Sequence, residues 1–389
     1  MSEGSRLRFI WSGMRWVVFF ASAAGVVRAV RNDLDNFLGS DKGWNTPKHV
    51  MYIGIDGFGG EYMRNASGEI PSLSELCKNG SVTFEMRDQM PSVSAPNWAT
   101  ILTGLDPVLS GIQDNDWAPD SRHTDPDLGQ TGLPPVSGKG AIPESIFDMI
   151  RREQTQRTIR VAHNWDWIKF MCGENNCDDR FRGDDDAVAA KVSEWVGAIG
   201  EDERTFTFVH FDEVDGVGHS SYWGSDKYYE AVRGRDKNVQ TIVTALSARG
   251  FLGDSLIVVT ADHGGFGSGH GGFRLSDMNV PAVFVGPGVK KGFKFGEGGN
   301  IQRTNNRDLV PTILKLMGIA RGRYMTGRVL EEIFVVGDGP ENEMETHKEE
   351  TEKEKQRAKS SPPFTSSSSI ISESSGEERE ELRVLRRAS

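Results

Sequence analysis

The stretch Ser255-Leu-Ile-Val-Val-Thr-Ala-Asp-His-Gly-Gly265 is the part of the chain from which the fold can be worked out. Its first six residues form an unbroken apolar and β-branched run, which is typical of a strand buried on both faces of a parallel sheet. The predicted strand ends at Asp262 and His263, and ligands of open α/β sheets bind beyond the carboxyl ends of the strands. Both side chains could hold one divalent cation there, although an Asp-His turn in a glycine-rich loop would give the same local sequence.

Two other predicted strands end in the same way. The run His49–Ile55 leads into Asp56, and the run Thr205–Phe211 leads into a segment that holds Asp215 and His219. The carboxyl ends of parallel strands meet at one edge of a sheet, so these side chains are expected to lie near Asp262 and its neighbours.

A serine provides a fourth cluster, in Met90-Pro-Ser-Val-Ser-Ala-Pro-Asn97. Pro96 is suited to the first turn of a helix, which puts Ser94 just before a helix N-terminus, where backbone N–H groups would receive a phosphate. A plain helix-capping serine is the alternative. Ser92 points the same way as Ser94 in an extended segment, so sequence geometry alone does not choose between them.

Strands and helices alternate over residues 47–335, which predicts an α/β fold with a mostly parallel sheet and helices on both faces. The predicted strands are His49–Ile55, Ser81–Phe84, Thr158–His163, Thr205–Phe211, Ser255–Thr260 and Val280–Gly286. The predicted helices are Pro143–Arg152, Asp184–Ile199, Ser225–Arg249 and Asn306–Met317, with shorter ones capped by Ser72 and starting near Pro96. With 389 residues, 37% of them hydrophobic, the chain can bury one large core.

The two ends of the chain differ from this region. Residues 1–46 contain arginines and an apolar run at 16–27, which resembles a secretory signal or weak membrane anchor; an amphipathic helix on a soluble protein is the alternative. Residues 336–389 are rich in Glu, Lys and Ser and predict a disordered polar tail. We therefore expect a secreted or membrane-associated protein, with a disulfide between Cys172 and Cys177 if the compartment is oxidising.

The composition also limits the class of substrate that we expect the protein to bind. The net charge of −11 argues against a surface that coats nucleic acid. An anionic substrate would then need local cations. The clusters supply ligands for two ions, namely Asp56, Asp215, Asp262, His219, His263 and His270, together with Ser94. Three carboxylates and three imidazoles suit zinc, and two ions about 4 Å apart can clamp the attacking and leaving oxygens of a phosphoryl transfer.

At this level of detail the sequence resembles the alkaline phosphatase superfamily, and most closely its type I phosphodiesterase/nucleotide pyrophosphatase family. The resemblance covers about residues 49–320. It rests on Gly54-Ile-Asp56-Gly57, Pro91-Ser-Val-Ser94-Ala-Pro-Asn97, Thr103-Gly104-Leu105, Gly111-Ile-Gln-Asp-Asn115, Asp215-Gly-Val-Gly-His219, Asp262-His263-Gly264, Val280-Pro281 with Gly286-Pro-Gly288, and Asp308-Leu-Val-Pro-Thr-Ile-Leu314.

The resemblance implies an alkaline phosphatase-like fold and a two-metal hydrolase of small phosphorylated substrates. One ion would be held by Asp215, His219 and His270, and the other by Asp56, Asp262 and His263 with the nucleophile Ser94. Attack on phosphorus would give a phosphoseryl intermediate that water then hydrolyses. Asn115 would donate a hydrogen bond to a phosphoryl oxygen.

The sequence departs from the family pattern at several positions. Ser94 stands where the family usually has threonine, and Ala95 stands where an aromatic residue stacks on a nucleobase, which puts a preference for nucleotides in doubt. His270 follows Asp262 more closely than in the nucleotide pyrophosphatases. Trp98 occupies the arginine position of the sulfatase signature. A phosphomonoesterase, a sulfatase-like hydrolase and a non-catalytic binding protein that keeps the fold are the alternatives.

Other polar residues receive simpler interpretations. His163 and His210 lie within predicted strands and are expected to be core or near-site residues rather than ligands. Asp212 and Glu213 read as an acidic turn that tunes or caps the site. The Asp184-Asp185-Asp186 run is interpreted as a helix N-terminal charge cluster.

Overall fold

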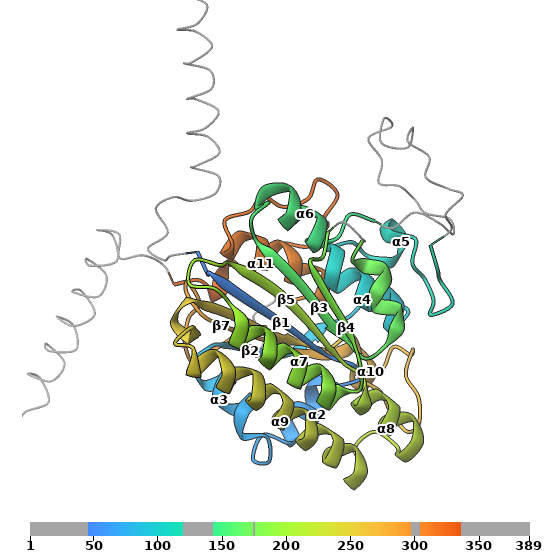
Figure 1. Cartoon of the computed structure of the whole chain (residues 1–389). Helices are drawn as coiled ribbons and strands as arrows, with labels where there is room; N and C mark the ends of the chain where they lie inside the picture. The colour runs from blue at the N-terminus through green and yellow to red at the C-terminus, as the bar shows by residue number, and fades with distance from the viewer. Residues whose placement is uncertain (1–45, 120–142, 174–175, 297–303, 336–389) are drawn as a thin grey trace, which may run out of the picture. The chain divides into compact units, whose positions relative to one another are not determined.

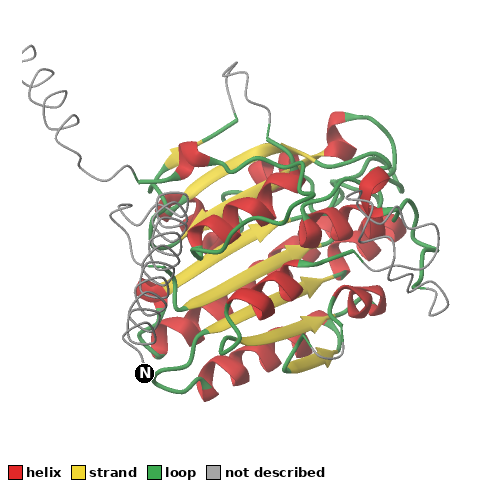
Figure 2. Ribbon diagram, turned by 90° about the horizontal axis from the view of Figure 1, so that it is seen from above, coloured by secondary structure: helices red, strands yellow, loops and turns green. Residues whose placement is uncertain are grey.

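The computed structural model describes residues 46–119, 143–173, 176–296 and 304–335. Its centre is an eight-stranded sheet in the order β4-β3-β5-β1-β6-β7-β2-β8. The strands are β1 His49–Ile55, β2 Ser81–Arg87, β3 Thr158–His163, β4 Asp179–Arg182, β5 Thr205–Phe211, β6 Ser255–Thr260, β7 Asn279–Val285 and β8 Phe293–Lys294. Figure 2 shows these strands side by side, with most arrowheads pointing to one edge.

The sheet is mostly parallel, as predicted, with one strand reversed. β1 runs parallel to β5 and β6, and β3 runs parallel to β4 and β5. β7 is antiparallel to both of its neighbours, β6 and β2. The connection from β6 to β7 holds only the short helix α10, Leu275–Met278. No crossover helix lies within it, so the chain turns back beside β6 instead of crossing to a parallel position.

Helices lie on both faces of the sheet, as predicted. They are α2 Gly60–Asn65, α3 Pro71–Asn79, α4 Ser94–Thr103, α5 Pro107–Ser110, α6 Ile146–Glu153, α7 Asp185–Ala198, α8 Glu213–Ser221, α9 Asp226–Ala248, α10 and α11 Leu309–Leu316. Short 3-10 turns are η2 Asp166–Met171, η3 Leu252–Asp254, η4 Asn306–Asp308 and η5 Glu331–Ile333. Figure 1 shows α3, α7 and α9 on one face and α4, α6 and α11 on the other.

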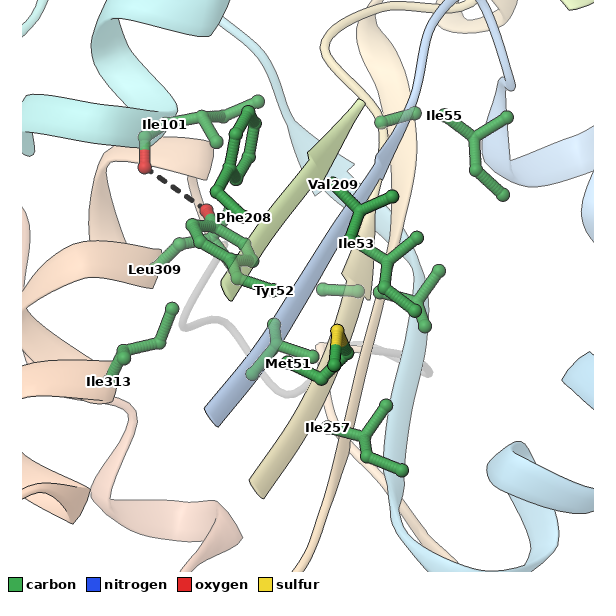
Figure 3. Close-up of a cluster of buried hydrophobic side chains, with 14 of the residues drawn as sticks. Met51, Tyr52, Ile53, Ile55, Ile101, Phe208, Val209, Ile257, Leu309 and Ile313 are labelled. Carbon is green, nitrogen blue, oxygen red and sulfur yellow. Dashed lines mark hydrogen bonds between the residues drawn. The ribbon is translucent and has the colours of Figure 1, made fainter. Parts of the chain in front are cut away.

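The core is continuous through the central strands. Figure 3 shows Tyr52 and Phe208 pointing towards α4 and α11, while Ile53 points to the opposite face. The Tyr52 hydroxyl donates to the Ile101 carbonyl oxygen over 3.0 Å, so the one polar atom of this large buried side chain is satisfied. This contact ties α4 to β1.

Several helix ends differ from the predicted ones. α4 begins at Ser94 itself, with Val93 as its N-cap, so the serine is the first helical residue and not the residue before the helix. α6 begins at Ile146, three residues later than predicted, because the Ser145 side chain caps it. Ser72 does not cap α3, whose first helical residue is Pro71.

Some predictions lie outside the described residues, namely those for the apolar run at 16–27 and for the tail at 336–389. Within the described part of the chain, no helix is long and apolar enough to cross a membrane. Cys172 and Cys177 form a disulfide, as the sequence allows.

Candidate active site

The strands β1, β5 and β6 end level with one another, and this brings the acidic clusters together. In register, Gly54 of β1 pairs with His210 of β5 and with Thr260 of β6. Asp56 therefore lies beside the start of α8, and Asp262 follows within two residues of the end of β6. The carboxyl ends of these three strands therefore lie together, as predicted from the sequence.

Asp56, Asp262 and His263 form one compact group, in which one potential ligand atom from each lies within 4.8 Å of the others. His263 Nε2 is 3.5 Å from Asp56 Oδ1 and 3.3 Å from Asp262 Oδ2. The Ser94 hydroxyl oxygen is 3.2 Å from the same nitrogen. The predicted nucleophile and the predicted second ligand set thus lie together, and all four side chains are buried.

A second group of potential ligand atoms overlaps the predicted set at Asp215 and His270. Asp215, His263 and His270 lie within 4.8 Å of one another, and the rings of His263 and His270 stack at 3.7 Å between centroids. His219, expected in this set, lies next to it, with Nε2 3.4 Å from Asp215 Oδ2 and a half-exposed side chain. His263 is therefore shared between the two groups, because it stands between Asp56 and Asp215.

The three histidines of the cluster are oriented alike. Nδ1 of His263 lies 2.7 Å from the Gly264 carbonyl oxygen, and Nδ1 of His270 and His219 lies 2.9 Å from carbonyl oxygens of Ser92 and Ser268. A carbonyl only accepts, so Nδ1 carries the proton in each ring and Nε2 presents its lone pair. All three Nε2 atoms face the aspartates, which is the arrangement of metal-ligating histidines.

The carboxylates leave matching acceptor atoms without partners. Among the described residues, no hydrogen-bond donor reaches Asp56 Oδ1, Asp215 Oδ1 or Asp262 Oδ2. These three oxygens all lie 3.3–3.9 Å from His263 Nε2. Buried acceptors of this kind are costly unless a cation or proton is supplied. The donor set therefore fits divalent cations.

The pKa values of the clustered aspartates and histidines also favour a bound cation. Burial raises the pKa of Asp56 to about 7, and burial together with the Asp56 charge raises the pKa of Asp215 to about 8. Burial also raises the pKa of Asp262 well above its ordinary range and lowers the pKa of His263 and His270. Three carboxylates in one pocket cannot all ionise unless positive charge enters with them.

Asp56 is held by two residues that the sequence did not mark as parts of the site. Its Oδ2 accepts from Trp98 Nε1 over 2.9 Å and lies 3.2 Å from His210 Nε2. Both donors approach Oδ2, which leaves Oδ1 directed at His263. A Cβ on Gly54 would lie 2.3 Å from the Trp98 ring, so this glycine is what admits the indole. His210 was expected as a core or near-site residue, and it is the latter.

The remaining predicted site residues lie around Ser94. The Ser92 hydroxyl donates to the Asp88 carboxylate, its oxygen also lies 3.1 Å from the Asp277 carbonyl oxygen, and Ser92 is fully buried. Only Ser94 of the two serines faces His263. Asn115 Oδ1 accepts from the Ala95 N–H over 2.8 Å, which fixes its amide group beside the first turn of α4.

Comparison with known proteins gives three kinds of match. The profile described as type I phosphodiesterase/nucleotide pyrophosphatase matches residues 50–279. Mouse ectonucleotide pyrophosphatase/phosphodiesterase family member 1 is 23% identical over 228 residues, covering 55% of this chain and 24% of that protein. A 2,3-bisphosphoglycerate-independent phosphoglycerate mutase from Vibrio vulnificus is 31% identical over 142 residues, covering 35% of this chain and 25% of the mutase. The chain thus spans about a quarter of the length of these relatives.

Solved structures extend the likeness to the fold. Murine ectonucleotide pyrophosphatase/phosphodiesterase 5, as an inactive variant in complex with AMP, matches with a TM-score of 0.58 at 14% identity, covering 75% of this chain and all of that one. A 2-O glycosaminoglycan sulfatase matches with a TM-score of 0.55 at 15% identity, covering 74% of this chain and 73% of the sulfatase. At such identities the likeness concerns the fold alone, which is the predicted alkaline phosphatase-like one.

Proposed function

The chain belongs to the type I phosphodiesterase/nucleotide pyrophosphatase family, and on that premise we propose that it is a metal-dependent hydrolase of phosphodiester or pyrophosphate bonds. One observation carries the proposal. Three unpartnered carboxylate oxygens lie 3.3–3.9 Å from His263 Nε2, and this nitrogen is 3.2 Å from the Ser94 hydroxyl oxygen. A binding protein freed from chemistry has no need for this arrangement.

Two divalent cations are proposed to bind there. Asp56, Asp262, His263 and Ser94 would hold one, and Asp215, His219 and His270 would hold the other. A mixed set of imidazoles and carboxylates suits zinc. When bound, the cations would supply positive charge that favours the ionised serine and the charged phosphoryl oxygens.

The residues of the chain then have separate tasks. The Ser94 oxygen is proposed to attack phosphorus, so that the Ser–O–P bond forms while the bond to the leaving oxygen breaks; water then cleaves the phosphoseryl ester and restores the hydroxyl. Ser94 is the first residue of the ten-residue helix α4, so the N-terminus of this helix would face a phosphoryl group attacked by Ser94. The Asn115 amide, fixed by Ala95, would donate to a phosphoryl oxygen.

The leaving group is proposed to bind differently from a nucleobase stacked behind the nucleophile. Ala95 is fully buried and offers no aromatic face. Large exposed side chains instead lie on the segments next to His219 and His270: Tyr222 is 62% exposed and Phe273 84% exposed. Murine ectonucleotide pyrophosphatase/phosphodiesterase 5, which shares the fold, has been solved in complex with AMP, and this supports a small phosphorylated substrate. We propose that the apolar part of such a substrate binds at Tyr222 and Phe273.

Hydrolysis rates on an aryl phosphodiester, an aryl phosphomonoester and an aryl sulfate, measured side by side with zinc content, test this function. We expect the diester to be cleaved fastest, and only by the metal-loaded protein. Preference for the monoester or the sulfate would favour the alternatives within the superfamily. A zinc-loaded protein without activity on all three would support a binding role.

The cellular location and the domain bounds are further parts of the proposal. We place the catalytic domain at residues 47–335 and assign residues 1–46 to a secretory signal or anchor. The Cys172–Cys177 disulfide supports an oxidising compartment. Expression of the full chain in a eukaryotic cell, with the protein found only in the reducing cytosol, would contradict this location.

A further inference from the structure

We propose that Asp185 is a positioning residue for the metal site, because it caps in trans the helix that carries Asp215 and His219. The inference rests on the proposed two-metal function. It concerns the Asp184-Asp185-Asp186 run, which the sequence suggests is a charge cluster at the start of α7. All three aspartates lie at the start of α7, as predicted: Asp184 caps the helix by accepting from the Ala187 N–H over 2.8 Å, and Asp185 and Asp186 are in its first turn.

Asp185 turns away from its own helix and is 3% exposed. Its Oδ1 accepts from the backbone N–H of Asp212 over 2.9 Å, and its Oδ2 accepts from that of Glu213 over 3.0 Å. These are the N-cap and first residues of α8. Helix N-termini leave such N–H groups without partners inside the helix, and a carboxylate there also interacts favourably with the helix dipole.

A cap from another helix is needed because α8 does not cap itself. Asp212 is the N-cap, a position where aspartate usually caps through its own side chain, yet Asp212 makes no such bond. A potential ligand atom of Asp212 lies instead within 4.8 Å of atoms of Asp56 and His210. Asp185 therefore supplies the cap that Asp212 does not provide.

Two further residues hold the Asp185 carboxylate in place. Arg235 of α9 donates to Oδ2 over 2.7 Å, and its side chain is only 5% exposed. Asn164, just after β3, donates to Oδ1 over 2.8 Å. The carboxylate thus joins the end of β3, the start of α7, the middle of α9 and the first turn of α8, where Asp215 lies at the third helical position.

The chain contains a matched control for this arrangement. Asp236, the neighbour of Arg235, caps α3 in trans: it accepts from the Leu73 N–H over 2.7 Å and from the Ser72 N–H over 3.2 Å. Asp236 is also 3% exposed. Because α3 carries no residue of the site, loss of this cap should affect stability alone.

Calorimetric zinc titration of the metal-free, full-length protein tests the inference, with Asp185→Asn compared to Asp236→Asn and to the unchanged protein. Asparagine keeps the shape but sets an N–H₂ group against donors. We expect Asp185→Asn to weaken one of two zinc sites by about 10- to 100-fold, as when a side chain that supports a metal ligand is lost. Asp236→Asn should lower the melting temperature and leave both zinc affinities unchanged.

The outcomes separate this inference from the proposed function. Absence of zinc binding by the wild-type protein would overturn the proposed function. Two normal zinc sites in Asp185→Asn would overturn only the positioning role, and so would an equal loss in Asp236→Asn, since any lost cap would then act alike. If Asp185→Asn does not fold, Asn164→Ala, which removes a single donor to the same carboxylate, carries the test: a loss at one zinc site supports the role, and two normal sites overturn it.

Discussion

The buried charged groups at the two ends of strand β1 differ in whether their hydrogen bonds are complete. At the amino end, the guanidinium of Arg157 is 2% exposed and donates to the carbonyl oxygens of Lys48 over 2.7 Å, Thr205 over 2.9 Å and Pro47 over 3.2 Å. At the carboxyl end, Asp56 is equally buried, but its Oδ1 has no donor among the described residues.

This difference in hydrogen bonding distinguishes residues that stabilise the fold from residues that are suited to bind a ligand. A buried polar group whose hydrogen bonds are complete within the chain contributes to stability, while one with an unused atom carries a cost that only a ligand or proton can relieve. We therefore expect changes at the amino end to alter the free energy of unfolding, and changes at the carboxyl end to alter metal binding and turnover.

The largest effect is expected from Ser94→Ala. Turnover of an aryl phosphodiester should fall by several orders of magnitude, because the proposed covalent route would be lost, while the six other proposed ligands should keep zinc bound. Ser92→Ala is the control, and should cost at most about a factor of ten through lost positioning. Single-turnover kinetics with elemental analysis decide the matter: a zinc-loaded Ser94→Ala protein with near-normal turnover would exclude the phosphoseryl route.

At the opposite end, Arg157→Met should lower the free energy of unfolding by about 3–5 kcal/mol, since it removes several hydrogen bonds from a buried charged group, each worth about 1.5–3 kcal/mol. Zinc content and turnover of the folded fraction should stay unchanged. Denaturant unfolding measures the loss, and Arg157→Lys, which keeps a donor, should lose less. Loss of zinc in Arg157→Met at low temperature would show that the two ends are not independent.

Removal of metal should reverse the pH dependence of stability. Asp56 and Asp215 have pKa values of about 7 and about 8 in the folded, metal-free protein, against an ordinary 3.8. Between the ordinary pKa of 3.8 and these raised values, the folded state holds more protons than the unfolded state. The free energy of unfolding therefore falls as the pH rises across this range. Zinc binding needs the ionised carboxylates, so zinc affinity rises with pH over the same range.

Melting temperatures in chelator at pH 5 and pH 8 measure this effect. One pKa unit is worth about 1.4 kcal/mol, and 1 kcal/mol moves the melting temperature of a large domain by about 2–4 °C, so we expect a fall of at least ~5 °C towards pH 8. The zinc-loaded protein is the control. A chelated protein that is more stable at pH 8 would mean that the carboxylates are not a repelling group.

Trp98→Phe should weaken zinc binding by about tenfold, because Asp56 loses one of the two donors that direct its free oxygen. The matched control is Trp167→Phe, which removes a buried indole that donates to the Trp117 carbonyl over 3.0 Å, away from the cluster. Zinc titration distinguishes the two. Equal affinities in both variants would show that Trp98 only fills space.

The smallest effect is expected from truncation to residues 45–335. That chain should unfold cooperatively and keep its turnover, because the proposed catalytic domain contains both ends of β1 and every site residue. Thermal unfolding and diester hydrolysis are the measurements. Loss of a cooperative transition would mean that the domain boundary is misplaced.

The sequence alone predicted most of the sheet. β1, β3, β5 and β6 have the bounds expected from their largely apolar and β-branched sequences, which are typical of strands buried on both faces of a parallel sheet. It also predicted which residues meet at the strand ends, since parallel strands place their carboxyl ends at one edge. The reversal of β7 was not predicted, because its apolar run is compatible with either direction.

Only the tertiary structure decided how the site is held. His263 stands between both groups of ligands, Trp98 and His210 direct Asp56, and Asp185 caps a helix that begins 28 residues further along the chain. No local pattern encodes these contacts. An aspartate before a helix looks the same whether it caps its own helix or another, and the packing of distant elements determines which N–H groups its carboxylate reaches.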